Sequence, residues 1–211
     1  MILHKLAPAV LLAVCATGAL AQAPLPGLRV EPATGSSILF VHNAAGQPPL
    51  TAFLVELVHY PGSYYQLWDD DITTQPIAPD AEKRISISNM TVGAVPNYVK
   101  LTAAIYADGT TAGVPEKISE LVARRKFLLE TTRELIVRVD KPGAATDLKQ
   151  WADSLPALTR ATQNVQEAIN QSAAKTLVAE TAAQMDKHSV ADVLTALRAS
   201  EAALIASKPA L

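Results

Sequence analysis

An α+β fold is the class that this sequence predicts, and three observations support it. A series of short segments with alternating apolar residues lies before residue 110, separated by turn residues. A long apolar stripe with steps of three and four residues follows, and the last third is rich in alanine, threonine, glutamine and leucine. We therefore expect an immunoglobulin-like β-sandwich over residues 37–113, a long amphipathic helix over 114–140 and an α-helical tail over 144–211.

Residues 1–23 have the pattern of a secretory signal peptide. His4 and Lys5 give a weakly basic start, an apolar run follows, and Ala21-Gln22-Ala23 has small residues at the positions of a cleavage site. The apolar run is shorter than the roughly 20 residues that cross a bilayer. We expect cleavage near Ala23, a mature chain without a membrane span, and a periplasmic or extracellular location.

Cys15 is the one cysteine in the sequence and lies inside the predicted signal peptide. Cleavage would leave no thiol, which excludes disulfides, cysteine nucleophiles and thiolate metal ligands from the mature protein. A lipidated Cys15 is the alternative, but Val14 stands where a lipobox has a small residue. The formal net charge of −2 at pH 7 gives no basic excess that would favour nucleic acid, so no nucleic-acid partner is expected.

The predicted sandwich begins after residues 24–36, where three prolines and two glycines favour a linker. Residues 51–60 should form the central strand, because they are rich in branched and aromatic side chains. Asp108-Gly109 predicts the turn after the last strand. The expected strands are 38–41, 51–60, 64–68, 83–89 and 98–106.

The long helix is predicted to begin near Pro115, since proline suits the first helical position, and to end before Pro142-Gly143. At about 1.5 Å per residue it would be roughly 35 Å long. Its apolar stripe is wide, so we expect the helix to pack against another part of the protein or against a partner. Arg125 lies on the same seam, where it would either specify a partner helix or extend past the edge of the stripe to water. The predicted helix-interface residues are Ile118, Leu121, Val122, Arg125, Leu128, Leu129, Leu135 and Ile136.

The tail should contain several helices with a thin core. Pro156 interrupts its apolar seam and favours the start of a new helix after Ser154. Ser189 with Asp192 resembles a capping box that opens the last helix. Because many seam positions are alanine, threonine or serine, the tail is expected to lean on the long helix, pair with another chain or stay partly mobile.

The best candidate ligand site is a group of four aromatic residues, because aromatic faces on sandwich loops often bind sugars or peptides. The alternative is that they pack in the core or cover a sheet edge. The acidic run 69–71 could hold Ca²⁺ but is more typical of a solvated loop. The aromatic candidates are Tyr60, Tyr64, Tyr65 and Trp68.

Catalytic motifs are missing from the sequence. His42, His59 and His188, which follow the signal peptide, have no partner at metal-ligand spacing, and no nucleophile elbow, phosphate loop or His-Glu-x-x-His occurs. The basic cluster 124–126 has acidic partners one helical turn away, which favours a solvated face. We expect no catalytic residues, no metal and no cofactor.

Residues 98–135, YVKLTAAIYADGTTAGVPEKISELVARRKFLLETTREL, resemble a segment of uncharacterised exported bacterial proteins. In that group a sandwich-like part also has a strand and turn similar to residues 51–63. The resemblance covers about residues 50–138 and is most specific at Asp108-Gly109 and Pro115-Glu116. It implies export and this architecture, and it carries no activity.

Together these features predict an exported, non-enzymatic structural or protein-interaction module. Its partner would be another protein or a second copy bound through the helices. A ligand-binding sandwich, with carbohydrate as one ligand, is the alternative for the segment 60–68. A hydrolase using dispersed acids such as Asp70 and Glu82 is a third hypothesis, and two carboxylates across a deep pocket would support it.

Overall fold

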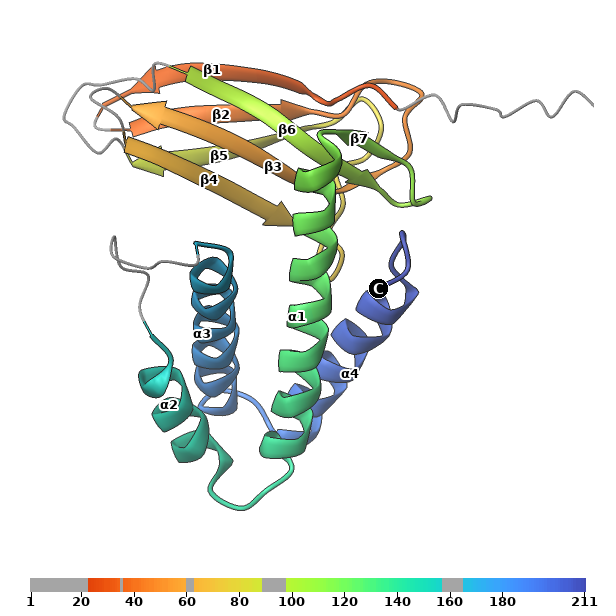
Figure 1. Cartoon of the computed structure of the whole chain (residues 1–211). Helices are drawn as coiled ribbons and strands as arrows, with labels where there is room; N and C mark the ends of the chain where they lie inside the picture. Colours follow the sequence, from red (N-terminus) through yellow and green to blue (C-terminus); the bar gives the residue numbers. More distant parts are fainter. Residues whose placement is uncertain (1–22, 35, 60–62, 89–97, 157–164) are drawn as a thin grey trace, which may run out of the picture.

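The computed structural model describes residues 23–34, 36–59, 63–88, 98–156 and 165–211. Within these ranges the chain is α+β, with seven strands followed by four helices (Figure 1). The strands are β1 (Gly27–Ala33), β2 (Ser36–His42), β3 (Leu50–His59), β4 (Ser63–Asp70), β5 (Glu82–Ser88), β6 (Tyr98–Tyr106) and β7 (Thr111–Gly113). The helices are α1 (Pro115–Val139), α2 (Ala144–Ser154), α3 (Val165–Met185) and α4 (Val190–Ala206).

Two antiparallel sheets form the first half, with strand orders β1-β2-β5 and β4-β3-β6-β7. Alternate residues of the strands meet between the sheets in one apolar core that contains Leu39, Phe53 and Tyr106. The expected strands are therefore present, and β3 is central in its sheet. The immunoglobulin-like arrangement of the strands stays a prediction.

The linker prediction for residues 24–36 is wrong over β1. This segment pairs with β2 in register from Gly27–His42 to Ala33–Ser36, and Leu28 and Val30 pack against the core. Its proline content misled the prediction. Pro32 is tolerated because β1 lies at the edge of its sheet, where a missing N–H need not break the ladder.

The turn at Asp108-Gly109 is confirmed, and it joins β6 to the short β7, which the alternation pattern did not predict. Gly109 has a φ of 93°, and the Asp108 carboxylate accepts a hydrogen bond from the Thr110 N–H at 2.9 Å. Gly113 ends β7 with a φ of 104°, and a Cβ there would lie 2.1 Å from the Thr102 carbonyl oxygen. Close backbone approach thus requires glycine at the entry to α1.

Helix α1 begins with Pro115 at its first turn, as predicted, and contacts two different cores. Near its start, Leu121 packs on the outer face of the sheet that contains β3 and β6, against Leu54 and Ile105. Near its end, Leu135 and Val139 pack among the tail helices. Figure 1 shows this single helix running from the sandwich through the helical half.

The tail leans on α1, which is one of the three expected arrangements. Helix α3 packs on α2 and α1, and α4 lies along α1. Alanines occupy buried positions, so the core is thin: Ala152, Ala174 and Ala182 are all buried. The Ser189 hydroxyl accepts a hydrogen bond from the Asp192 N–H at 3.2 Å, which confirms the predicted cap of α4.

Some sequence predictions fall on residues that are not described. They include the signal peptide up to residue 22 and most of the first turns of the new helix expected after Ser154, because residues 157–164 are not described. None of the helices in the described part of the chain combines the length and the apolar character needed to cross a membrane.

Candidate functional site

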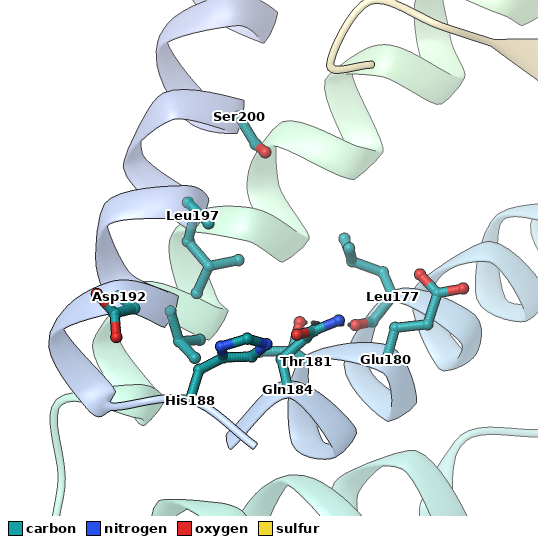
Figure 2. Close-up of a pocket in the computed structure, with 10 residues that line it drawn as sticks. Leu177, Glu180, Thr181, Gln184, His188, Asp192, Leu197 and Ser200 are labelled. Carbon is teal, nitrogen blue, oxygen red and sulfur yellow. Dashed lines mark hydrogen bonds between the residues drawn. The ribbon is translucent and has the colours of Figure 1, made fainter. Parts of the chain in front are cut away.

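A groove lies between α3 and α4. Figure 1 shows these helices joined at their ends farthest from the sandwich and separating toward it. The space between them holds about 370 Å³ (Figure 2). Its lining residues are Leu177, Glu180, Thr181, Gln184, His188, Asp192, Val193, Ala196, Leu197 and Ser200.

The floor of the groove continues the helical core. Val193 and Leu197 are 5% and 7% exposed and belong to the same apolar cluster as Leu135 of α1. Leu177 packs against this cluster. The Thr181 hydroxyl donates to the Leu177 carbonyl at 2.8 Å, so its polarity is satisfied within α3. The floor therefore presents mainly carbon atoms on side chains that the core holds in place.

The rim of the groove is acidic. Glu180 on α3 and Asp192 on α4 are exposed, and the ten lining residues include no lysine or arginine. The Ser189 hydroxyl donates to Asp192 Oδ2 at 2.6 Å. Hydrogen bonds from Ser189 lower the pKa of the Asp192 carboxyl below its ordinary 3.8, so this group stays charged near neutral pH.

Between the sandwich and the helical half lies a buried ion pair. Arg125 is fully buried, and its guanidinium donates to both carboxylate oxygens of Asp70, at 2.7 and 3.1 Å. It also donates to the Thr51 hydroxyl at 2.8 Å and to the Lys208 carbonyl at 3.1 Å. One side chain thus connects β4, β3, α1 and the segment after α4.

The predicted role of Arg125 needs correction. It does lie at an interface of the long helix, but it does not extend to water, and its partners come from this chain rather than from another helix. A guanidinium with five donors can be buried when a bidentate carboxylate and further oxygens satisfy it. This joint is structural in character, since its groups are enclosed and already paired.

The acidic run 69–71 is also not a solvated loop. Strand β4 continues to Asp70, and its alternation turns Asp70 to α1 while Asp69 and Asp71 pair with Lys83 at 2.9 and 2.7 Å. Burial raises the pKa of Asp69. Burial also lowers that of Lys83, but hydrogen bonds from its ammonium group to Asp71 and Asp69 outweigh this effect, and its pKa is raised.

Metal binding finds no support from this arrangement. Within the described ranges, no group of three or more histidine, cysteine or acidic side chains could hold a metal ion. Of the two acids in the hydrolase hypothesis, Asp70 pairs with Arg125, and Glu82 lies 3.4 Å from Arg29 in the other sheet. The two carboxylates thus belong to separate ion pairs, on strands of different sheets.

The four aromatic candidates have different outcomes. Trp68, like Ile118 and Val122, packs against the buried cluster that joins the sheet to α1 through Leu121. The Arg124 guanidinium lies 5.5 Å from the centroid of the Trp68 ring. This is the packing alternative. Tyr64 and Tyr65 lie on β4, where only their backbone is described, and Tyr60 is outside the described residues. For these three, ligand binding stays a prediction.

The predicted helix-interface residues divide along α1. Ile118, Leu121 and Val122 face the sheet, and Leu135 and Ile136 face the tail. The other two leucines are Leu128, which is half-buried, and Leu129, which is buried.

The groove residues were not predicted from the sequence. A weak signal exists, because Leu177, Thr181 and Gln184 recur at steps of four and three on α3. Comparisons with protein-family models, with curated proteins and with solved structures found no match to this chain. The geometry of an α+β protein with an open interhelical groove is therefore the basis for a functional proposal.

Proposed function

We propose that this chain is an exported, non-enzymatic interaction module whose α3–α4 groove binds a partner. In this proposal the sandwich and α1 form the scaffold, and the two diverging helices form the binding surface. The observation that carries it is the apolar floor left open between α3 and α4.

Physical reasoning favours binding at this place. Covering apolar surface contributes roughly 25 cal/mol per Å², and here that surface is concave rather than scattered. Val193 and Leu197 are held by the core around Leu135, so binding would require little ordering of the floor itself. A preformed groove on a fixed helix pair is suited to reversible recognition.

Export is supported by the pattern of residues 1–23 and by the resemblance described above. The Tyr106 hydroxyl donates to the Pro24 carbonyl at 2.8 Å, which would hold the start of the mature chain on the sandwich. N-terminal sequencing of the protein recovered from the cell envelope tests this part. We expect a start near Pro24, and a chain that retains residues 1–23 would contradict it.

Two photo-cross-linking variants test the groove. A cross-linking amino acid replaces Ala196, which is exposed in the groove, or Ala199, which is exposed on the same helix but does not line it. We expect partners of the exported protein in its own envelope to be captured from position 196 and not from position 199.

A matched pair of arginine substitutions completes the test. Ala196→Arg places a large cation in the groove and should reduce partner capture by about tenfold or more. Ala199→Arg makes the same chemical change outside the groove and should leave capture unaltered. Equal capture by both folded variants, or no specific capture by the unmodified protein, would overturn the proposal.

A further inference from the structure

We infer that the α3–α4 groove receives a basic amphipathic helix of a partner protein. Such a helix would place apolar residues on the floor and lysine or arginine toward both rims. This inference rests on the proposed function and names the chemistry of the partner. Its basis is the dimensions of the groove, the helical character of its walls and the sign of its rim charge.

The dimensions suit about two turns of helix. The lining stripe of α3 runs from Leu177 to Gln184 and that of α4 from Asp192 to Ser200. At about 1.5 Å per residue these stripes are roughly 10 to 12 Å long. An occupying helix would therefore contribute a short row of residues spaced i, i+3 or i+4, and i+7.

The walls favour a helix over an enclosed small molecule. Small-ligand sites enclose most of the surface of their ligand, and the volume of about 370 Å³ alone would allow such a ligand. The groove lies between two separate helices, however, and is only partly enclosed by the chain. A third helix laid between α3 and α4 would cover the floor as α1 does from the opposite side.

The charge of the rim selects among helices. Glu180 lies on α3 and Asp192 on α4, so each helix contributes one exposed acidic residue to the groove lining. His188 is at the closed end, where α3 connects to α4. Basic side chains would pair with both carboxylates, whereas an acidic helix would meet like charges across a distance of a few ångströms.

Two synthetic peptides of about 15 residues test the inference. Both have leucines at i, i+3 and i+7, and they differ only in carrying lysine or glutamate at the flanking positions. Each is titrated into the isotope-labelled exported chain, and backbone amide shifts are followed by NMR. We expect the lysine peptide to shift amides of the groove lining and to bind at least about tenfold more tightly than the glutamate peptide.

A charge reversal in the protein provides the matched variant. Glu180→Lys should lower the affinity for the lysine peptide by about fivefold. Glu130→Lys makes an equal charge change at an exposed position of α1 and should change that affinity by less than about twofold. Raising NaCl from about 50 to about 500 mM should also weaken it, because exposed pairs are screened.

Several results would overturn the inference. The first is equal binding of the two peptides, and the second is no shift in the groove with either peptide. The third is an unaltered affinity of the lysine peptide for the Glu180→Lys variant. The fourth uses phenethylammonium, a small aromatic cation, as a probe: groove shifts with this molecule but not with the lysine peptide would indicate a small-ligand site. Groove-dependent self-association in sedimentation experiments would also overturn the inference.

After any of these results, the Ala196→Arg variant separates the two proposals. If this variant loses partner capture, the proposed function stands and only the inference about a basic helix fails. If the variant captures partners as the unmodified protein does, both fail.

Discussion

The sandwich and the helical half differ in the largest side chains that their cores bury. The sandwich interior contains Leu39, Phe53 and Tyr106, all at most 1% exposed. The core formed by α2, α3, α4 and the end of α1 includes buried alanines, and Thr131 and Thr181 satisfy their hydroxyls on their own helices. Buried aromatic rings thus occur in the sandwich core, whereas the buried apolar residues in the described part of the helical core are all leucine, valine or alanine.

This difference suggests where recognition should take place. In the sandwich, the outer face of the sheet that contains β3 and β6 already packs against α1 through Leu121. The helical half leaves a groove between α3 and α4, with Val193 and Leu197 at its floor. Its thinner core also makes it more dependent on α1 and on the joint around Arg125.

The largest effect is expected when that joint is broken. Arg125→Met would leave the Asp70 carboxylate, only 7% exposed, without its ion-pair partner. Loss of one member of a buried pair costs about 3–5 kcal/mol of unfolding free energy, measurable by urea denaturation. If the two regions are coupled through this pair, both should lose stability together.

Two controls accompany the Arg125 experiment. Arg133→Met removes an exposed pair with Glu201 and should cost less than about 1 kcal/mol. Combining Asp70→Asn with Arg125→Met should recover part of the loss, because no unpaired charge remains. A loss below about 1 kcal/mol for Arg125→Met would contradict the coupling.

A glycine pair sharpens the comparison of packing. Gly113→Ala would combine a strained φ of 104° with a Cβ 2.1 Å from the Thr102 carbonyl, and should cost about 3–4 kcal/mol. Gly143→Ala, between α1 and α2, has a φ of 77° but open space around the new methyl group. It should cost only about 1 kcal/mol. Equal thermal shifts in the two variants would argue against the difference in packing.

Two buried leucines compare the cores directly. Leu39 in the sandwich and Leu148 in the helical half are both 0% exposed. Leu39→Ala should cost about 3 kcal/mol, and Leu148→Ala about 2 kcal/mol, because neighbouring small side chains and helices can close part of the cavity. Urea unfolding of the two variants tests this order, and the reverse order would break the comparison.

The smallest effect is expected at the start of α4. Ser189→Ala removes the N-cap hydroxyl and should cost about 1 kcal/mol in thermal unfolding at neutral pH. The lowered pKa of Asp192 contributes stability above its unfolded value of 3.8, and this is lost as the pH falls through the lower folded value. The difference between variant and unmodified protein should therefore shrink in acid and stay constant near neutrality.

Local patterns predicted much of the fold because they act within one element. Period-two alternation predicted β2 to β6, and Pro115 predicted the start of α1. The strand β1 was missed because prolines resemble a linker, although an edge position tolerates them. The run 69–71 was assigned to a loop because composition does not reveal that a strand sends successive acids to opposite partners.

The candidate site could not be predicted in the same way, since it depends on how separate helices diverge. The sequence indicated an apolar stripe on α1 but not that Leu121 and Leu135 belong to two cores. Arg125 was noticed as unusual, yet Asp70 lies 55 positions away and Lys208 lies 83 positions away. The groove between α3 and α4 similarly follows from tertiary packing.

Helix α1 also sets the mechanical behaviour of the molecule. Its 25 residues form one uninterrupted rod of roughly 37 Å, without an interior proline or glycine that would act as a hinge. A load applied to α4 is transmitted along this rod to the sandwich instead of being absorbed by a linker. A partner bound at one end of α1 is therefore held at a fixed distance and orientation from the other end.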